Sequence, residues 1–381
     1  MHTHLFLKNF VTALFFIALN AQSFAQIDKA ETGIKSIMED LDVVGLSVVV
    51  VKKGKIIYNN SFGLKEVATN TPLTNKDIFR IASISKSFSA TSIMQLVEAR
   101  KLSLHDDFSK LVGFTIRNPK FPETVITLRM VMSHTSSIND SQGYFNFDVI
   151  NPAKAANYTK CYSDYEPGKG YRYCNLNYNM VGAVIEKISG ERFDNYVKRH
   201  ILNPLNLYGG YCVDSLDANL FTTLYEYDST KKFTPLPAAY NPRREEIKNY
   251  IMGYTTPIFS PTGGMKISAT DLAKYMMMHM NYGKYKGVRI MSKKSSKIMQ
   301  TKIADKEGYG LAITNIDNLI AGKVMTGHTG SAYGLYSAMF FNQKEKFGIV
   351  VITNGSNPAY KDELQVVIRR TVNSLYESFI K

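Results

Sequence analysis

Strand-like segments lie near both ends of this 381-residue chain, and helix-like segments fill the region between them. Residues 44–51 form a run rich in valine, and residues 55–60 continue the strand pattern after a tight-turn signal at Lys53 and Gly54. Four further strand-like runs follow late in the chain, at 309–314, 319–325, 335–341 and 347–353. This distribution predicts one sheet built from both ends of the chain, with a helical subdomain inserted between them.

Several segments have helical patterns with recognisable ends. Residues 194–201 end before an Asn-Pro pair, and residues 271–282 end at a glycine. A last helix is predicted from apolar residues that share one face: Leu364, Val367, Ile368, Val372 and Leu375. We therefore predict a mixed α+β chain of the α/β class, with a sheet subdomain over about 27–80 and 255–381 and a helical subdomain over about 81–254.

The first 25 residues have the features of a secretory signal peptide. Lys8 precedes an apolar stretch over 10–21 that is too short to span a bilayer, and small residues at Ser23 and Ala25 fit a cleavage site. An uncleaved anchor is the alternative. No cysteine lies near the cleavage point, which argues against a bacterial lipid anchor. We expect residues 26–381 to be exported by a bacterium, periplasmic or secreted, with no stable membrane span after cleavage.

The three cysteines are an odd number, so one thiol is left over even in an oxidising compartment. A bridge from Cys161 to Cys174 or to Cys212 is conceivable, and the sequence does not choose between them. The seven histidines do not cluster with cysteines or acidic residues at ligand spacings. We therefore expect no metal and no other cofactor.

The formal charge of the chain is +14, or +13 without residues 1–25, which contain one Lys and no acidic residue. This excess favours anionic surroundings. The basic residues are dispersed and form no recognition motif, which argues against nucleic acid as a partner. Anionic cell-envelope polymers are the better candidate partners, and a solvated charged surface is the plain alternative.

A serine and a lysine three positions apart, Ser83 and Lys86, open a long amphipathic segment that runs to Leu102. In a helix, positions i and i+3 share a face, so the amine can accept the serine proton or hold its acceptor in place. Free backbone N–H groups in the first turn also favour developing negative charge there. The same S-x-x-K spacing begins at Ser229 and Ser378, but the former lies in a polar turn-like stretch and the latter near the chain end.

A nucleophilic serine also needs a proton relay to the leaving group. Tyr173 and Asn175 supply a phenol and a carboxamide two residues apart, between a Pro-Gly turn and an apolar helix. The same Tyr-x-Asn spacing occurs at Tyr58, in a predicted strand, and at Tyr144, in an aromatic loop that could equally line a substrate groove. Position relative to the turn and the helix therefore favours Tyr173.

A group of hydrogen-bond donors for the substrate carbonyl oxygen is predicted at residues 327–331, directly before the strand at 335–341. Small residues at a strand edge let a substrate approach backbone N–H groups, and histidine and threonine add side-chain donors. His134 is a competing histidine, which we interpret as a structural hydrogen-bonding residue. The predicted substrate-binding residues are Asn175, His328, Thr329, Gly330 and Ser331.

In this order, Ser83-x-x-Lys86, Tyr173-x-Asn175 and His328-Thr329-Gly330 resemble the motifs of the serine β-lactamase and penicillin-binding protein superfamily. The chain looks most like the group of class C β-lactamases, D-alanyl-D-alanine carboxypeptidases, D-aminopeptidases and related esterases. Supporting stretches are residues 127–136, 261–264 and 309–311. The resemblance implies a β-lactamase/transpeptidase-like fold, with an antiparallel sheet from both chain ends flanked by helices.

The resemblance also implies roles for the matching residues. Ser83 would attack the substrate carbonyl, Lys86 and Tyr173 would share the proton relay, and Asn175 would hold the substrate amide. The backbone N–H groups of Ser83 and Ser331 would form the oxyanion hole. Because the ordinary pKa values of lysine and tyrosine lie near 10, one of the two must be lowered to act as a base near neutrality, and the choice between them stays open.

Two features depart from the family pattern. The third motif of most β-lactamases begins with Lys, and here it begins with His328, as in some D-peptidases and esterases of the group. An imidazolium that forms near pH 6.5 would then have to replace a permanent cation for a substrate carboxylate. Residues 235–258 look like additional material, either a plain surface loop or a source of specificity contacts, with these candidates: Arg243, Arg244, Tyr250 and Tyr254.

These observations predict an exported serine hydrolase that works through an acyl-enzyme. A D-amino-acid peptidase or carboxypeptidase acting on cell-wall-type peptides fits best. A carboxylesterase and a β-lactamase are alternatives with the same chemistry. A penicillin-binding receptor or inactive relative that does not turn over is the alternative from a different class. The expected partner is a small peptide, ester or β-lactam substrate.

Overall fold

The computed structural model describes residues 25–228, 230, 232–305 and 307–381. Residues 1–24 of the predicted signal peptide and Ser229 of the second S-x-x-K pair lie outside the described residues. Within the described part of the chain, no helix combines the length and the apolar character needed to cross a membrane.

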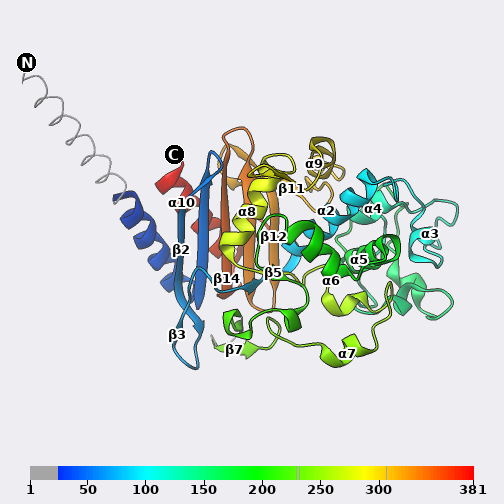
Figure 1. The fold of residues 1–381 in the computed structure, drawn as a ribbon, viewed down its shortest axis with the longest axis horizontal. Coiled ribbons are helices and arrows are strands. Elements are labelled where there is room, and N and C mark those ends of the chain that lie inside the picture. The colour runs from blue at the N-terminus through cyan, green and yellow to red at the C-terminus, as the bar shows by residue number, and fades with distance from the viewer. Residues whose placement is uncertain (1–24, 229, 231, 306) are drawn as a thin grey trace, which may run out of the picture.

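A seven-stranded antiparallel sheet forms one half of the structure (Figure 1). Its strands lie in the order β11-β12-β13-β14-β1-β2-β3. Their bounds are β1 Gly45–Lys52, β2 Lys55–Glu66, β3 Thr71–Pro72, β11 Thr314–Ile320, β12 Lys323–Ala332, β13 Leu335–Asn342 and β14 Phe347–Gly355. Strand β1 pairs with β14 with Val48 opposite Val351, which joins the two ends of the chain. The predicted sheet from both chain ends is confirmed.

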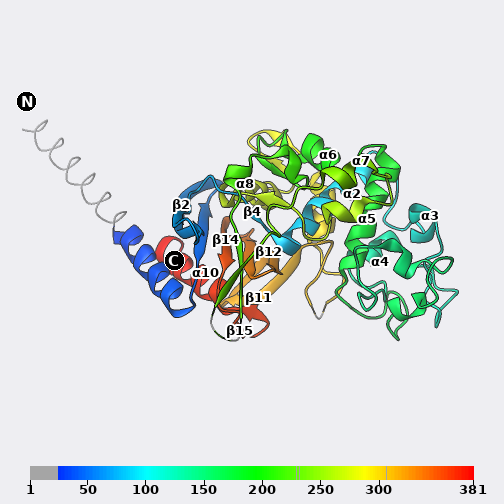
Figure 2. The same ribbon diagram turned by 90° about the horizontal axis from the view of Figure 1, so that it is seen from below.

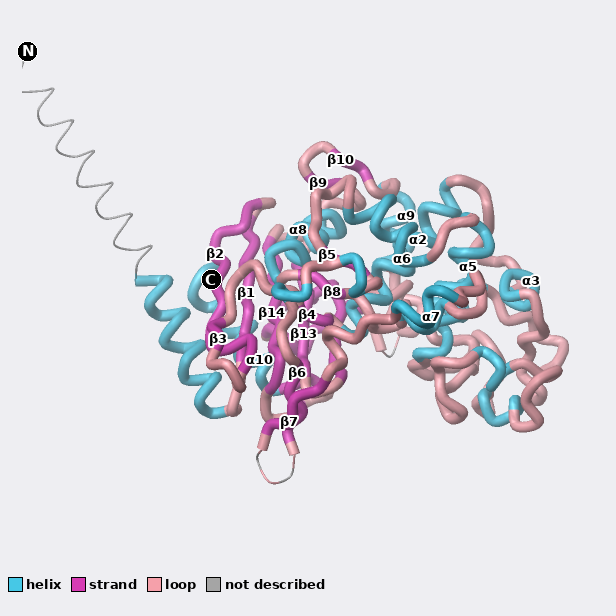
Figure 3. The backbone as a smooth tube through the Cα atoms, turned by 60° about the horizontal axis from the view of Figure 1, so that its bottom comes forward, coloured by secondary structure: helices cyan, strands magenta, loops and turns pink. Residues whose placement is uncertain are grey.

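Short strands form small separate ladders around this sheet (Figure 3). They are β4 Phe79–Arg80, β5 Gly209–Gly210, β6 Leu224–Tyr227, β7 Phe233–Leu236, β8 Lys266–Ile267, β9 Lys284–Tyr285, β10 Val288–Arg289, β15 Tyr360–Lys361 and β16 Leu364–Gln365. The ladder of β4, β8 and β5 is the one that matters for function, because β4 leads directly into Ser83.

Helices cover both faces of the main sheet and gather beside it (Figures 1 and 2). The α-helices are α2 Ser85–Glu98, α3 Phe108–Val112, α4 Leu128–Met132, α5 Asn175–Ser189, α6 Phe193–Val197, α7 Arg244–Lys248, α8 Ala269–Met280, α9 Lys293–Gln300 and α10 Val366–Phe379. The short 3₁₀ helices are η1 Ala82–Ile84, η2 Phe147–Ile150, η3 Tyr158–Cys161, η5 Val213–Ser215, η6 Ala218–Leu220 and η7 Thr256–Phe259, and η4 Lys198–Leu202 is a π-helix. Residues 25–40 are also helical.

The alternation of side chains along β1 separates two hydrophobic clusters. Val48 and Val50 pack with apolar residues of helix 25–40 and of α10 on one face of the sheet. Val49 and Val51 pack into the larger cluster on the other face, which includes α8 and the helices α2 and α5. Because both faces are covered, β1 carries valine at four consecutive positions, 48–51, and this is the pattern that made it recognisable in the sequence.

Several predicted boundaries were wrong. Residues 309–314 are not a strand, because Tyr309 makes only isolated bridges, and 319–325 spans the turn between β11 and β12 at Gly322, whose φ is +71°. Leu364 belongs to β16 and precedes the last helix. Residues 25–40 form a helix that was not predicted, since the first predicted element of the domain is the strand at 44–51. The subdomain limits stay a prediction.

All three cysteines are buried free thiols, so the structure forms neither of the two disulfides considered above. Cys161 donates to the carbonyl oxygen of Val149, and the Cys174 thiol donates to the Asp140 carboxylate.

Candidate active site

Ser83 and Lys86 lie at the junction between the sheet and the helices. Ser83 is in η1, the 3₁₀ turn that directly precedes α2, and Lys86 is in the first turn of α2. The Nζ atom of Lys86 lies 3.1 Å from the Oγ atom of Ser83, within hydrogen-bond distance. The predicted pairing of hydroxyl and amine is present in the geometry.

The Lys86 side chain is fully buried and held by two further hydrogen bonds. Nζ donates to Oδ1 of Asn175 at 2.9 Å and to the carbonyl oxygen of Thr262 at 3.0 Å. Burial lowers the pKa of Lys86 to about 7, and the negative charge of Asp140 opposes this shift. A neutral amine beside a serine hydroxyl is therefore accessible near neutral pH.

Asn175 is the first residue of α5, and Asp140 fixes it there. The Asp140 carboxylate accepts the backbone N–H groups of Asn175 and Leu176 at 2.8 and 2.9 Å, which caps the helix. It also accepts Nδ2 of Asn175 at 3.0 Å, so Oδ1 of Asn175 is turned toward Lys86. Asn175 thus positions Lys86, a role that the expected contact with a substrate amide did not include.

Tyr173 lies over the same amine. Its ring centroid is 4.7 Å from Nζ of Lys86, and burial raises the pKa of the phenol, with a hydrogen bond from Ser83 opposing the shift. His134 packs against this ring at 4.4 Å between centroids, and its Nδ1 accepts the backbone N–H of Cys174. The interpretation of His134 as a structural hydrogen-bonding residue is confirmed. Tyr173 is therefore a protonated phenol at neutral pH.

Residues His328 to Ser331 lie within β12, at a stretch with one open edge. Strand β11 pairs with β12 only as far as Gly327, whereas β13 continues to Ala332. The segment before Ser83 packs closely here, since a Cβ atom on Gly330 would lie 2.3 Å from the carbonyl oxygen of Ile81. Only glycine permits this approach, so Gly330 sets how near β12 lies to η1.

His328 is buried and differs from the expectation of a titrating cation. Burial lowers its pKa to about 4, and the neighbouring Lys86 charge adds to the effect. One ring nitrogen lies against the carbonyl oxygen of Thr329, and Nε2 lies 3.3 Å from the hydroxyl of Tyr309. A pKa lowered to about 4 favours the neutral ring near pH 6.5, which argues against an imidazolium in place of a permanent cation there.

The competing motifs lie elsewhere. Tyr58 is in β2 and bonds to Glu31 of the N-terminal helix, and Ser378 is in α10 on the far face of the sheet. Tyr144 is the exception and lies near the site, because its carbonyl oxygen accepts Nδ2 of Asn179 at 2.7 Å, one turn after Asn175 in α5. Among the predicted site residues, Ser83, Lys86, Tyr173, Asn175 and the 328–331 segment converge.

A family model described as Beta-lactamase matches residues 31–372. The chain belongs to the Beta-lactamase family. Members of this family are serine hydrolases, and the residues that converge here belong to the three motifs named above. The "Protein flp" of Staphylococcus aureus (strain N315) is 23% identical over 358 residues, which cover 88% of this chain and 64% of that protein. The chain thus spans less than two thirds of this relative.

Solved structures show the same fold. The octameric penicillin-binding protein homologue from Pyrococcus abyssi is 26% identical, with a TM-score of 0.71 over 92% of this chain and 76% of that one. The D-amino acid amidase from Ochrobactrum anthropi SV3, complexed with L-phenylalanine amide, is 17% identical, with a TM-score of 0.70 over 93% and 98%. The predicted β-lactamase/transpeptidase-like fold is confirmed.

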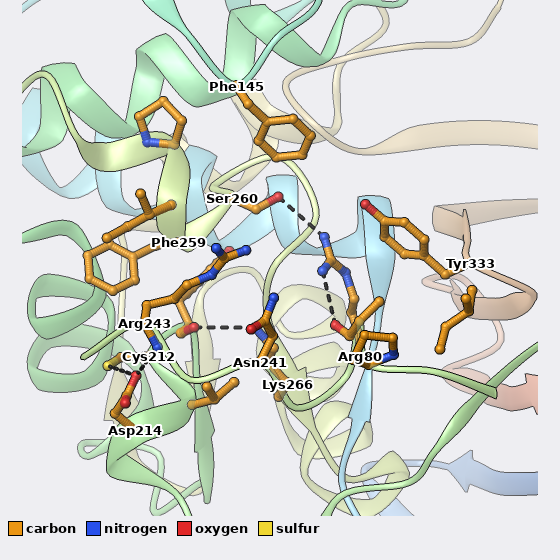
Figure 4. A pocket seen from close by; sticks show the side chains of 17 residues that line it. Arg80, Phe145, Cys212, Asp214, Asn241, Arg243, Phe259, Ser260, Lys266 and Tyr333 are labelled. Carbon is orange, nitrogen blue, oxygen red and sulfur yellow. Dashed lines mark hydrogen bonds between the residues drawn. The ribbon is translucent and has the colours of Figure 1, made fainter. Parts of the chain in front are cut away.

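In this member of the Beta-lactamase family, a cavity of about 420 Å³ adjoins the Ser83 site (Figure 4). We call it the Arg80 cavity. Its polar lining includes Arg80, Lys266, Arg243 and Ser260, with the rings of Phe145 and Tyr333 at its rim. No sequence pattern indicated it, because its residues come from separate segments between Arg80 and Tyr333.

The additional segment 235–258 runs along this cavity and is fastened to α5. The buried carboxylate of Glu186 accepts the Tyr250 hydroxyl, the Gly253 N–H and the Thr256 hydroxyl. Of the four candidate specificity residues, only Arg243 lines the cavity. Arg244 pairs with Asp214, Tyr250 bonds to Glu186, and Tyr254 bonds to Asp148.

Asp140 is the residue of the site that sequence reasoning missed. It caps α5 from a position 35 residues earlier in the chain, so no local capping pattern reveals it. Thr262 was recognised only as part of a supporting stretch, and its carbonyl oxygen holds Lys86. Backbone acceptors of this kind leave no signal in side-chain types.

Proposed function

We propose that this protein is a serine hydrolase that works through an acyl-enzyme at Ser83. The observation that supports it most is the 3.1 Å contact between Ser83 Oγ and the buried amine of Lys86. An amine whose pKa is lowered to about 7 is neutral often enough at neutral pH to accept the hydroxyl proton. Membership of a family of serine hydrolases supports the same reaction class.

The first half-reaction follows from these positions. Ser83 Oγ attacks the carbonyl carbon, a C–O bond forms, and the serine proton passes to Lys86 Nζ. The bond to the leaving amine then breaks, and the amine takes up a proton through the Tyr173 phenol, which Lys86 reprotonates. Tyr173 serves as a donor because its pKa is raised, whereas that of Lys86 is lowered.

Backbone donors would stabilise the tetrahedral intermediate. The N–H groups of Ser83 and of Ser331, on the open edge of β12, are the candidates for the oxyanion hole. Each such donor contributes about 3 to 4 kcal/mol in comparable acyl-transfer sites. Water then attacks the acyl-enzyme, with Lys86 as the base, and releases the acid and free Ser83.

The substrate class that we propose is a D-amino-acid peptide of the cell-wall type, hydrolysed by a peptidase or carboxypeptidase outside the cytoplasm. The relatives that support it are the penicillin-binding protein homologue and the D-amino acid amidase, whose folds this chain shares. Esters and β-lactams are alternative substrates of the same site. A receptor that is acylated without turnover is the alternative from a different class.

Mass spectrometry of the intact protein tests these alternatives together. The protein is mixed with a fluorescent penicillin, with D-dipeptides and with short esters, and both the adduct mass and product release are followed. We expect an acyl adduct that turns over with D-peptides. A stable adduct without product would establish the receptor, and no adduct with any substrate or phosphonate would reject the proposal.

A further inference from the structure

Two basic residues stand directly opposite each other in the short ladder that leads into Ser83. Arg80 of β4 and Lys266 of β8 are register partners in an antiparallel pair. Like charges in this position destabilise a sheet unless a third group compensates them. The arrangement therefore requires an explanation beyond packing.

Lys266 is buried, with 6% of its surface exposed, and it lines the Arg80 cavity. Among the described residues its ammonium group makes one hydrogen bond, to the carbonyl oxygen of Tyr211 at 3.3 Å. An ammonium group has three donors, so capacity remains for a ligand. A buried cation with a single neutral partner is costly to maintain.

The Arg80 guanidinium is held in place, but not all of its N–H donors have a partner in the described residues. It donates to the carbonyl oxygens of Gly263 and Ala238 and lies 3.4 Å from the hydroxyl of Ser260. It also lies 5.0 Å from the ring centroid of Tyr333. These partners are neutral, and they fix the plane of a group whose other N–H donors stay available.

The cavity carries more positive than negative charge. Arg243 adds a third basic side chain, whose guanidinium is paired with Glu246 at 2.8 Å and faces the same space as that of Arg80 (Figure 4). Asp214 is the acidic residue of the lining, and it already accepts the Arg243 N–H and pairs with Arg244 at 3.3 Å. Burial, with Arg80 and Arg243 adding to it, lowers the pKa of Lys266, and a bound anion would favour its charged form.

The Arg80 cavity lies beside the Ser83 site, because a Cβ atom on Gly263 would lie 3.7 Å from Nη2 of Arg80 and 3.8 Å from the backbone of Ala82, which precedes Ser83. Arg80 is three residues before Ser83, and its partner Gly263 follows Thr262, whose carbonyl oxygen holds Lys86. Tyr333 follows the β12 segment that would supply the oxyanion hole. A substrate with its carbonyl at Ser83 can therefore extend a polar group into the cavity.

We propose that Arg80, Lys266 and Arg243 bind a carboxylate of the substrate, so that the enzyme prefers D-peptides with an acidic residue next to the scissile bond. This inference rests on the proposed function at Ser83. It assigns the task of carboxylate recognition to the Arg80 cavity, since His328 is neutral.

Matched D-dipeptides test the preference. One pair carries D-glutamate or D-glutamine before the scissile bond, and a second pair carries them after it. We expect kcat/KM to favour the acid in one pair by about ten-fold or more, as for charge-assisted hydrogen bonds. In Lys266→Met the ratio of acid to amide should fall toward one, and Arg243→Gln should lower it in part. Lys284→Met, an exposed lysine, is the control.

A binding measurement separates this inference from the catalytic proposal. In Ser83→Ala, glutarate should raise the melting temperature in a saturable way, glutaramide should not, and Lys266→Met should remove the effect. Retained turnover in Ser83→Ala together with glutarate binding would reject the catalytic role of Ser83 and leave the cavity as a carboxylate site. Equal kcat/KM for acid and amide in both pairs, or an unchanged ratio in Lys266→Met, would overturn the inference.

Discussion

Lys86 and Lys266 are both buried lysine side chains, and burial lowers the pKa of each, but their surroundings differ. Lys86 has Ser83, Asn175 and a backbone carbonyl within hydrogen-bond distance, and the Asp140 carboxylate lies near. Lys266 has one backbone carbonyl and stands opposite Arg80.

The difference shows that the neighbouring residues determine which role each buried lysine can have. The oxygens around Lys86 fix its position and balance its two charge states, which is what proton transfer requires. Lys266 has few partners and basic neighbours, which is what the capture of an anion requires. Burial alone would not distinguish a base from a binding group.

The largest effect is expected at Ser83, and the comparison fails if Ser83 is not the nucleophile. Ser83→Ala should lower turnover by about 10⁴-fold or more, because removing the nucleophile removes the covalent route. A phosphonate adduct should map to the peptide that contains Ser83 and be absent in the variant. Label found on another serine would show that Ser83 is not the nucleophile, and Lys86 would then not act as its base.

The next largest effect concerns Lys86 and Tyr173 as a unit. Lys86→Met and Tyr173→Phe should each reduce kcat/KM by about 10³-fold, and the double variant should be little worse than the poorer single one, because residues that act together are non-additive. Pre-steady-state acylation rates measure this. Nearly full activity in Tyr173→Phe would transfer the relay to Tyr144 or to water.

The pH dependence of kcat/KM sharpens the assignment of the base. If neutral Lys86 is the base, activity should rise about ten-fold from pH 6 to pH 8, since its pKa is about 7. Peptides with a free carboxylate and neutral esters should rise in parallel, because His328, with a pKa of about 4, does not titrate there. Profiles that diverge through pH 6.5, and converge in His328→Gln, would restore the histidine as the carboxylate-binding cation.

The smallest expected effect is on stability. Lys266→Met should raise the unfolding free energy by about 1 to 2 kcal/mol at pH 7, because it removes a buried charge opposite Arg80. A lowered pKa means that the unfolded state binds more protons, so wild-type stability rises with pH and the gain should shrink toward pH 10. Urea unfolding at pH 7 and pH 9.5 checks both signs. A variant that is less stable at both would show that the hydrogen bond to Tyr211 dominates.

The fold was predictable where burial leaves a mark on composition. Strands β1, β13 and β14 are almost entirely buried and rich in apolar residues, and the sheet between both chain ends followed from them. Strand β11 was missed in part because half of its residues are exposed or polar. Helix 25–40 was hidden by the strand pattern that follows it.

The site was predictable where side-chain types carry the chemistry. Ser83, Lys86 and Tyr173 converge as expected, whereas Asp140 acts across 35 residues and the Thr262 contact uses a backbone oxygen. Lys266 gave no signal, because a single lysine in a two-residue strand is unremarkable until its partner across the ladder is known. Contacts of this kind depend on the pairing of distant segments, which residue spacing does not contain.

The attachment of segment 235–258 to Glu186 divides that segment into two halves with different freedom to evolve. Residues 250–256 supply the partners of one buried carboxylate, so exchange there would release the segment from α5. Residues 236–243 include most of the segment's residues that line the Arg80 cavity, and none of the three bonds from 250–256 depends on them. Substrate range can therefore diversify in the first half while the second half keeps the scaffold constant, and libraries for altered selectivity are best confined to 236–243.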